Sequence, residues 1–352
     1  MCARRRGRDP ASLAFGVYTL TVRPLLAFTL VVATLGTARA DPVVLRMATV
    51  APDGTAWARE LRAGAREVED RTNGRLRIKW YFGAIGGDEL TVQRRIRQGQ
   101  LDGTASGGML CTRAAPALRI LRIPGIVQDR HQAAYVLSHL RPIADDEFRK
   151  SGLVNLGYSM LGASVLFTRE PIRTFEDLKR ARLWRWDLDD VAIELLRGAG
   201  LNIVALPLEA AGTAFDKQEI DGFSALPAAA LAFQWSAQAR YFTELPMDYL
   251  VGCMVVATRA FDELPNEDRQ VLQTATAKMM LRAQDLDERM SEALFGSLFE
   301  KQGMHRVAPS KLLWAQFFET ARDARQRLAA GLVDHELLAR VLGWLGDYQP
   351  PR

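Results

Sequence analysis

The sequence predicts a mixed α/β protein with two lobes and one long helix that spans both. Strand and helix patterns alternate through residues 43–106, the order that builds a parallel sheet with helices packed on it. Two later strand segments, at 153–168 and 250–258, could each cross from one lobe to the other. A helical pattern at 261–300, which starts after Leu264-Pro265, exceeds the usual length of a globular helix. These features favour two joined lobes over the alternative, a single large doubly wound enzyme fold.

The first lobe is expected to open with a β-α-β-α-β unit. Strands are expected at 43–50, 76–82 and 104–106, with helices at 57–72 and 88–98 between them. Residues 76–82 alternate strictly between apolar and polar, as in a strand with one buried face. In such a sheet the loops at the carboxyl ends of the strands are the side that binds ligands.

The remaining elements continue the same alternation. We expect a helix at 129–140, a bent pair of strands at 153–168 interrupted by Gly157 and Gly162, a second βα pattern at 182–223, a short strand at 304–307 and helices at 310–328 and 336–345. Lobe I is then predicted at 41–160 plus about 250–285, and lobe II at 161–249 plus about 286–352.

Residues 1–40 have the features of a secretory signal peptide. Arginines at positions 4, 5, 6 and 8 precede an apolar stretch at 25–35, which is too short for a comfortable membrane span. Ala38-Arg39-Ala40 is a cleavage-site pattern, so the mature chain is expected to begin near Asp41 in the periplasm. An uncleaved N-terminal anchor is the alternative.

The basic character of the chain belongs to that N-terminal segment. Residues 1–40 hold six of the 46 basic residues and one of the 41 acidic residues, so 41–352 carries 40 of each. No basic tract remains in this part of the sequence, and a nucleic-acid partner is not predicted.

Two cysteines lie in the predicted mature chain, at Cys111 and Cys253. Each sits in an apolar run, and their separation is not a Cys-x-x-Cys spacing. In an oxidising periplasm they could pair, but two separate buried thiols are the favoured interpretation.

Catalytic and metal-binding patterns are missing from the sequence. It contains no Gly-x-Ser-x-Gly elbow, no P-loop and no Gly-x-Gly-x-x-Gly after the first strand. The four histidines are far apart and show no metal-ligand spacing. The acidic pairs Asp145-Asp146 and Asp189-Asp190 are expected to be solvated helix starts. We therefore predict no enzyme, no metal site and no cofactor.

The most specific pattern lies at residues 174–187. Thr174 and Asp177 have the spacing of a capping box, and 182–187 alternates long polar and aromatic residues like a strand. Further matching runs lie at 48–55, 86–89, 98–103, 216–222 and 264–268. Together they resemble the solute-binding proteins of TRAP transporters, the DctP family (extracellular solute-binding protein family 7), whose motif is T-x-E-D-L-K-G-x-K-x-R.

The resemblance implies a hinged, two-lobed periplasmic-binding-protein-like fold that captures a small solute by closure and delivers it to a membrane permease. In the family, the last arginine of the motif clamps the ligand's carboxylate, and a second arginine often assists from the preceding strand. Counting along this chain places Trp184 and Ser164 at these two positions. The chain thus resembles a sub-branch with Trp in place of the clamping Arg, and a simple dicarboxylate is not the expected ligand.

Three neighbouring residues of the motif are candidates for the site. Trp184 is expected to point into the cleft, where its ring offers an apolar face and one N–H donor. Arg185 should point to the opposite face of the strand, unless a bulge or one-residue slip turns it inward. Trp186 shares the face of Trp184 and is either a cleft residue or a core residue.

Other candidates lie near the predicted strand ends or are aromatic residues that could line the cleft. The complete set of predicted ligand-binding residues is Trp57, Gly107, Ser164, Trp184, Arg185, Trp186, Phe223, Ser224 and Trp235. The turns Asp102-Gly103 and Asp221-Gly222 are instead expected to be structural, with glycine freeing the backbone.

The predicted ligand is a small hydrophobic, aromatic or weakly polar solute, although an aromatic cleft could equally hold a cation. The expected partners are the TRAP membrane permease subunits, and the resemblance adds a separate periplasmic helical-repeat protein. The alternative function is a periplasmic lipid- or peptide-binding or signalling protein on the same scaffold, without import.

Overall fold

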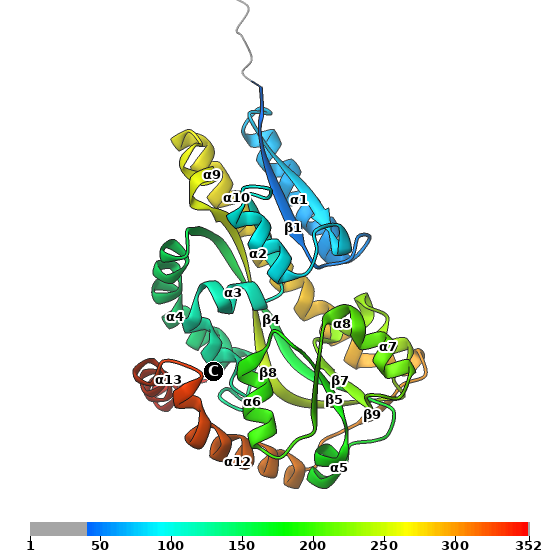
Figure 1. The fold of residues 1–352 in the computed structure, drawn as a ribbon. Coiled ribbons are helices and arrows are strands. Elements are labelled where there is room, and N and C mark those ends of the chain that lie inside the picture. The colour runs from blue at the N-terminus through cyan, green and yellow to red at the C-terminus, as the bar shows by residue number, and fades with distance from the viewer. Residues whose placement is uncertain (1–40, 351–352) are drawn as a thin grey trace, which may run out of the picture. The chain divides into compact units, whose positions relative to one another are not determined.

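The computed structural model describes residues 41–350, and the predicted signal peptide lies outside the described residues. Its strands are β1 (Val43–Thr49), β2 (Leu76–Phe82), β3 (Gly103–Ser106), β4 (Leu153–Thr168), β5 (Leu183–Trp186), β6 (Ile203–Leu206), β7 (Gly222–Ala225), β8 (Tyr241–Ala257) and β9 (His305–Val307). They form a sheet in the order β2-β1-β3-β8-β4-β7-β5-β6, with β9 paired to β8 (Figure 1).

The helices pack around this sheet as the alternating pattern predicts. They are α1 (Ala56–Arg71), α2 (Glu89–Arg97), α3 (Met109–Ala114), α4 (Arg130–Lys150), α5 (Phe175–Arg180), α6 (Asp190–Gly198), α7 (Ala211–Asp216), α8 (Pro227–Ala232), α9 (Thr258–Asp262), α10 (Asn266–Ala293), α11 (Phe299–Lys301), α12 (Lys311–Leu328) and α13 (His335–Asp347). Within 41–350, none of them combines the length and apolarity that crossing a bilayer requires.

The first unit forms as expected from its caps and strand pattern. The Thr55 hydroxyl caps α1 by accepting the Ala58 N–H at 3.2 Å, and the Asp88 carboxylate caps α2 by accepting the Thr91 N–H at 2.6 Å. β1 pairs in parallel with both β2 and β3. The β-α-β-α-β prediction is confirmed.

β4 and β8 are the long strands that join the two parts of the sheet. Each pairs antiparallel with the other over most of its length, while β3 pairs with the end of β8 and β7 with the end of β4. β4 is one bent strand, and its register shifts near Gly157 and Gly162. At Gly157 an added Cβ would lie 2.9 Å from Met280 Cγ, so glycine allows α10 to pack closely there.

Two predicted boundaries were wrong. β8 begins at Tyr241 and not near 250. The strand can include Pro246 because this residue lies where the β4–β8 hydrogen-bond ladder is interrupted, so the proline removes no ladder hydrogen bond. α4 continues to Lys150 through Pro142, where the sequence pattern predicts an end at 140. Burial of Ala144 and Phe148 beyond the proline stabilises the extra turns.

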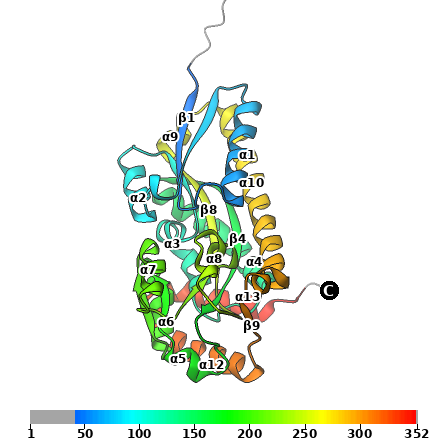
Figure 2. The same ribbon diagram turned by 90° about the vertical axis from the view of Figure 1, so that its right-hand side faces the viewer.

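The long helix is confirmed. α10 follows the short α9 after Pro265 and continues through the wider turn η5 (Leu294–Leu298) into α11. It packs on α1 and β4 at one end and on α8 further along (Figure 2). It therefore contacts elements from both of the predicted lobes.

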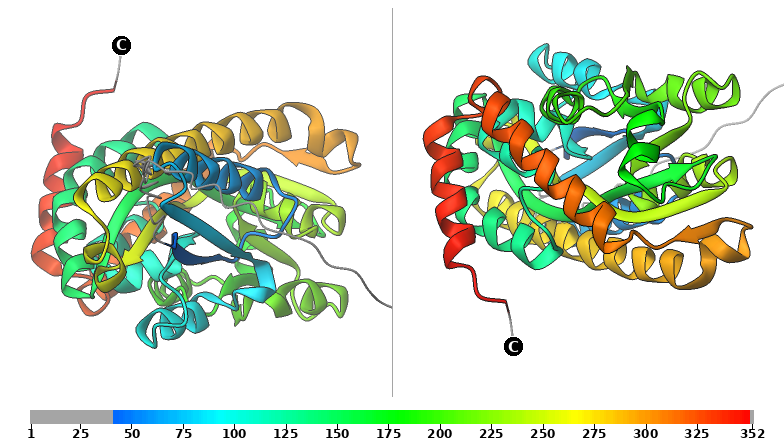
Figure 3. Two further views of the ribbon diagram at one scale, coloured as in Figure 1. Left: turned by 90° about the horizontal axis from the view of Figure 1, so that it is seen from above. Right: turned by 90° about the horizontal axis from the view of Figure 1, so that it is seen from below.

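Buried apolar residues form three clusters. The first joins β1, α1, α4 and the start of α10, and it also contains Leu337, Leu338 and Val341 of α13, which lies beside α4 (Figure 3). The other two lie on opposite faces of the β5 region, since Leu183 belongs to one and Trp184 to the other. The exact division into lobes stays a prediction. α13, which that prediction assigns to lobe II, packs in the first cluster beside α4, an element of predicted lobe I.

The two Asp-Gly turns are equivalent structural joints. Asp102 accepts the Arg46 N–H and its guanidinium at 2.9 and 2.8 Å, and Asp221 accepts the same two groups of Arg182, both at 2.9 Å. Glycine follows each aspartate because an added Cβ would lie 2.2 Å from Val255 O at Gly103 and 2.5 Å from Phe167 O at Gly222. Both positions require glycine because there is no space for a Cβ atom, and not because the backbone has a positive φ.

Cys111 and Cys253 form a disulfide, with their Cα atoms 5.9 Å apart. The expectation of two separate thiols was wrong. Both residues are fully buried in the first cluster, as their apolar surroundings suggest, but α3 and β8 bring them together. The sequence separation of 142 residues hides this proximity.

Replacing both cysteines by alanine is expected to lower the free energy of unfolding by roughly 4 kcal/mol, because the cross-link closes a long loop in the unfolded chain. Guanidinium unfolding of the wild type and the double variant, each with and without dithiothreitol, measures this. The reductant should destabilise only the wild type. Equal stability of all four samples would contradict the pairing.

Candidate ligand-binding site

A cavity of about 170 Å³ lies where the two parts of the sheet meet. This volume is close to the ~150 Å³ that holds a benzene ring. Its apolar wall comes from Val50, Ala51, Trp57, Leu61, Ala105, Met109, Leu161, Trp184, Trp186, Leu208, Ala225, Leu226, Ala229, Phe233, Trp235, Leu250, Met280 and Ala283. Its polar wall comes from Thr49, Ser106, Gly107, Arg122, Ser159, Ser164, Arg185, Asp189, Ser224 and Gly252.

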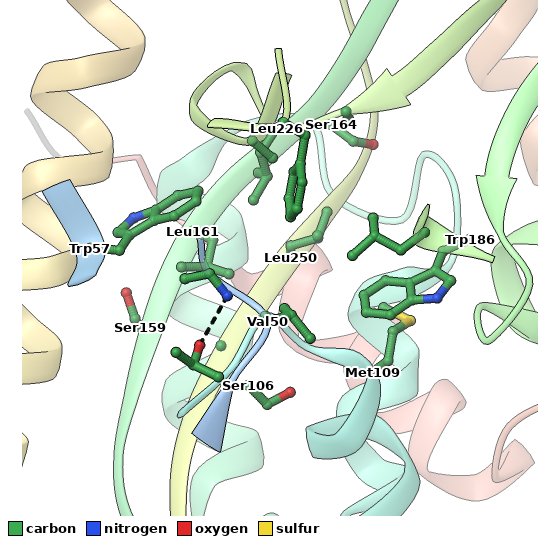
Figure 4. Close-up of a pocket in the computed structure, with 18 of the residues that line it drawn as sticks. Val50, Trp57, Ser106, Met109, Ser159, Leu161, Ser164, Trp186, Leu226 and Leu250 are labelled. Atoms are coloured by element: carbon green, nitrogen blue, oxygen red, sulfur yellow. Dashed lines mark hydrogen bonds between the residues drawn. The ribbon is translucent and has the colours of Figure 1, made fainter. Parts of the chain in front are cut away.

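Tryptophans enclose this cavity from several elements. Trp57 of α1 and Trp186 of β5 lie on opposite sides of it, with Leu161 and Leu250 between them in Figure 4. Both tryptophans are half-buried, so each presents a ring face while part of it stays accessible. An apolar solute could thus be held between two indole rings.

Trp184 lines the cavity and is 4% exposed. Its indole N–H donates to Leu206 O at 3.0 Å, and its ring meets Trp235 edge-on with centroids 5.0 Å apart. Its one donor is therefore already used. Trp184 offers a ligand an apolar surface only.

Eight of the nine sequence-predicted residues line the cavity, and Phe223 is the exception. Phe223 is fully buried and stacks on Trp235 at 4.8 Å and on Phe215 at 4.7 Å. It therefore supports Trp235 from behind instead of facing a ligand. Phe223 is the second residue of β7, and its side chain enters the apolar core.

The polar wall is built on a buried quartet of two arginines and two aspartates. Arg185 Nη2 lies 2.6 Å from Asp189 and 2.7 Å from Asp248. Arg122, from the end of the 3-10 helix η2 (Pro116–Arg122), bonds to Asp189 and lies 2.9 Å from Asp248. All four side chains are at most 5% exposed. Two positive and two negative charges make the quartet neutral.

Two serines extend the quartet to the neighbouring strands. Arg185 Nη1 donates to Ser224 of β7 at 3.0 Å, and the Ser164 hydroxyl of β4 donates to Asp248. Ser164, the second expected arginine position, thus contacts a carboxylate within the wall. The network ties β4, β5, β7 and β8 together at one point.

The charges of the quartet support one another. Burial alone would raise the pKa of Asp189, but Arg122 and Arg185 lower it below its usual value. Burial likewise would lower the pKa of Arg185, but Asp248 and Asp189 raise it. The pKa values of Asp189 and Arg185 are therefore both displaced in the direction that favours the charged form.

Arg185 lines the cavity although it lies on the face of β5 opposite to Trp184. β5 keeps an unbroken register with β6, so no bulge or slip turns the side chain inward. Arg185 nevertheless lines the cavity, as do Trp184 and Trp186. The cavity thus reaches both faces of β5 at its carboxyl end, which strand alternation alone cannot reveal.

Arg122, Asp189 and Asp248 were missed. Asp189 was expected to be a solvated helix start but is 4% exposed, because it must neutralise two guanidinium groups. Asp145 also departs from that expectation, since it lies inside α4 and accepts the Tyr158 hydroxyl at 2.7 Å. The sequence does offer a signal for Asp248, since this acid stands between apolar residues in a run that is expected to be buried.

Glu89 holds the loop that follows β3 at the rim of the cavity. Its carboxylate accepts the Ser106 hydroxyl and the Gly107 N–H, both at 2.9 Å, and the Leu110 N–H at 2.5 Å. Burial raises the pKa of Glu89, although these hydrogen bonds oppose the rise. Glu89 therefore positions Ser106 and Gly107 where they line the cavity.

Trp57 is anchored by a second buried acid. Its indole N–H donates to Asp287 Oδ1 at 2.7 Å, and Oδ2 has no hydrogen-bond partner in the part of the chain that is described. Burial raises the pKa of Asp287 to about 7, although Trp57 and Arg130 oppose the rise. The orientation of one cavity wall thus depends on a group that titrates near neutral pH.

No group of three or more His, Cys, Asp or Glu side chains within 41–350 has the arrangement of a metal site. Arg185 of the cavity wall instead pairs with Asp189 and Asp248 and donates to the Ser224 hydroxyl.

A family model described as bacterial extracellular solute-binding protein, family 7 (DctP), matches residues 47–331. The chain belongs to this family. An uncharacterized protein of Haemophilus influenzae is 23% identical over 283 residues, covering 74% of this chain and 83% of that protein.

Solved structures of similar solute-binding proteins share the fold. The sugar acid binding protein DctPAm from Advenella mimigardefordensis, in complex with galactonate, superposes with a TM-score of 0.80 at 17% identity, covering 87% of this chain and 99% of that one. A TRAP periplasmic solute binding protein from Haemophilus influenzae with bound L-gulonate gives 0.79 at 17% identity, covering 86% and 99%. The two-lobed fold is thus confirmed.

Asp287→Asn is expected to remove a pH dependence of stability in this family 7 protein. Between about pH 4, where an unfolded Asp titrates, and the native pKa of about 7, the native state binds more protons, so its stability falls as pH rises. As the pH rises from 4 to 8, the free energy of unfolding of the variant should increase relative to that of the wild type by on the order of 3 kcal/mol.

Urea unfolding at several pH values measures this, with the exposed Asp285→Asn on the same helix as control. The control should follow the wild type. Parallel curves for the wild type and Asp287→Asn would show that Asp287 does not titrate in this range.

Proposed function

We propose that this family 7 protein is the periplasmic solute-binding subunit of a TRAP-type transporter. It captures one small solute in the tryptophan-lined cavity by hinge closure and presents it to the membrane permease subunits. The cavity carries the proposal, since it lies between elements of both lobes. Closure would bury the solute, and the permease would respond to the closed state. Its role is binding without catalysis.

The solute itself is proposed to be small and largely apolar. The two similar structures hold L-gulonate and galactonate, which are polar sugar acids. This chain instead has Trp184 and Ser164 at the two positions where the family motif expects arginine, which supports placing it in a Trp-bearing sub-branch. Ring faces of Trp57 and Trp186 would stabilise an apolar solute at ~25 cal/mol per Å² of buried surface.

The residues proposed to contact the solute follow from the lining of the cavity. Trp57, Trp186 and Trp184 would supply apolar surface, and Gly107, Ser164, Ser224 and Arg185 polar groups, with Trp235 behind them. Phe223 would act only through Trp235. A periplasmic helical-repeat partner also belongs to this proposal, on the strength of the resemblance alone.

Trp57→Ala and Trp186→Ala are each expected to weaken solute binding about 10- to 100-fold, since each removes one ring face of the cavity. The solute is first identified by a thermal-shift screen of small aliphatic, aromatic and dicarboxylate compounds. Titration calorimetry then compares the variants with Trp344→Ala. The indole of Trp344, on α13, packs against His139 of α4 and is not part of the cavity lining.

Trp344→Ala should bind like the wild type. Tight binding of a dicarboxylate, unaffected by either cavity variant, would contradict the proposed site. Loss of cellular uptake of the identified solute on deletion of the gene would support the transport role.

A further inference from the structure

The cavity has no excess of positive charge, which is unusual for a site that would hold an anion. Its wall contains two arginines, Arg122 and Arg185, and both are neutralised by Asp189 and Asp248. A carboxylate of a solute would therefore meet two guanidinium groups whose charges are already balanced within 3 Å.

The other charged groups around the cavity do not supply a cation. Glu89 lies under the Ser106–Gly107 loop, and Asp287 lies behind Trp57. Arg130, near Asp287, is paired with Glu288 at 3.7 Å. Whether or not the two buried acids are ionised, they add no positive charge.

One hydrogen-bond donor of the quartet is nevertheless unused. Arg122 lines the cavity, and its Nη1 is buried without a hydrogen-bond partner among the described residues. Ser159 Oγ, also on the cavity wall, is likewise buried without a partner within 41–350. Both atoms are buried, so neither presents an accessible hydrogen-bonding group to a solute in the cavity.

We infer that the cavity selects a solute whose polar end is uncharged, such as an amide, ketone or alcohol, and that Asp189 and Asp248 exclude carboxylates. An uncharged polar end leaves the charges of the quartet balanced. A carboxylate would add an unbalanced negative charge to a desolvated wall that already holds two. This inference rests on the proposed solute-binding function and specifies its ligand class.

The same geometry shows what would reverse the selection. Removing one negative charge from the quartet, with little change in shape, leaves the two arginines with one aspartate. The resulting single positive charge resembles an unpaired arginine clamp, which favours a carboxylate through charge-assisted hydrogen bonds. Asp189→Asn and Asp248→Asn each make this change, and Asp189 is the one that lines the cavity.

Matched pairs of solutes test the inference by calorimetry. Isovaleramide is compared with isovalerate, and phenylacetamide with phenylacetate, because each pair differs only in the charged group. The wild type should bind each amide at least 10-fold more tightly than its acid. In Asp189→Asn the acids should gain at least 10-fold, so that the preference disappears or reverses.

Asp190→Asn provides the matched control, since Asp190 is the adjacent residue but pairs with Arg119 at the surface. It should keep the preference of the wild type. Asp248→Asn replaces Asp189→Asn if the latter does not fold, and the comparison of amide and acid on the wild type needs no variant.

The outcomes separate this inference from the proposed function. If the wild type binds the acids as tightly as the amides or more tightly, the inference is overturned while solute binding stands. If Asp189→Asn and Asp248→Asn keep the wild-type preference, the aspartates do not determine it. If no protein binds any of the four compounds, both the inference and the proposed apolar solute class are overturned.

Discussion

The buried arginine–aspartate quartet is the interaction on which the site depends. Arg185 of β5 and Asp248 of β8 meet Asp189 at the start of α6 and Arg122 at the end of η2. Removing one charge would leave its partners uncompensated in a dry interior, so the four side chains must be positioned together. The quartet connects β5 to β8 across β7 and β4, and so helps to place Trp184 and Trp186 on β5.

The same fold accommodates this site and the sugar-acid sites of its structural relatives. The Arg46–Asp102 and Arg182–Asp221 joints and the β4–β8 crossing depend on backbone spacing and not on the ligand. The cavity wall is free to change as long as its own polar groups are balanced. Trp184 illustrates this, since its indole N–H donates to Leu206 O and its ring packs against aromatic neighbours.

Local patterns in the sequence predicted most of the fold. Helix and strand patterns placed α1, α2 and β2 within about one residue of their bounds, and the capping box of Thr174 and Asp177 is present. The site was only partly predictable, because Arg122, Asp189 and Asp248 lie far apart in sequence and meet only through tertiary packing. The Cys111–Cys253 disulfide was missed for the same reason.

A double-mutant cycle on Arg185 and Asp248 tests most directly whether the quartet acts as one unit. Free energies of unfolding would be measured for Arg185→Met, Asp248→Leu and the double variant. The account predicts a coupling energy above about 1 kcal/mol, with the double variant more stable than either single variant because no buried charge of the pair is left unmatched. Additive effects, within about 0.5 kcal/mol, would contradict it.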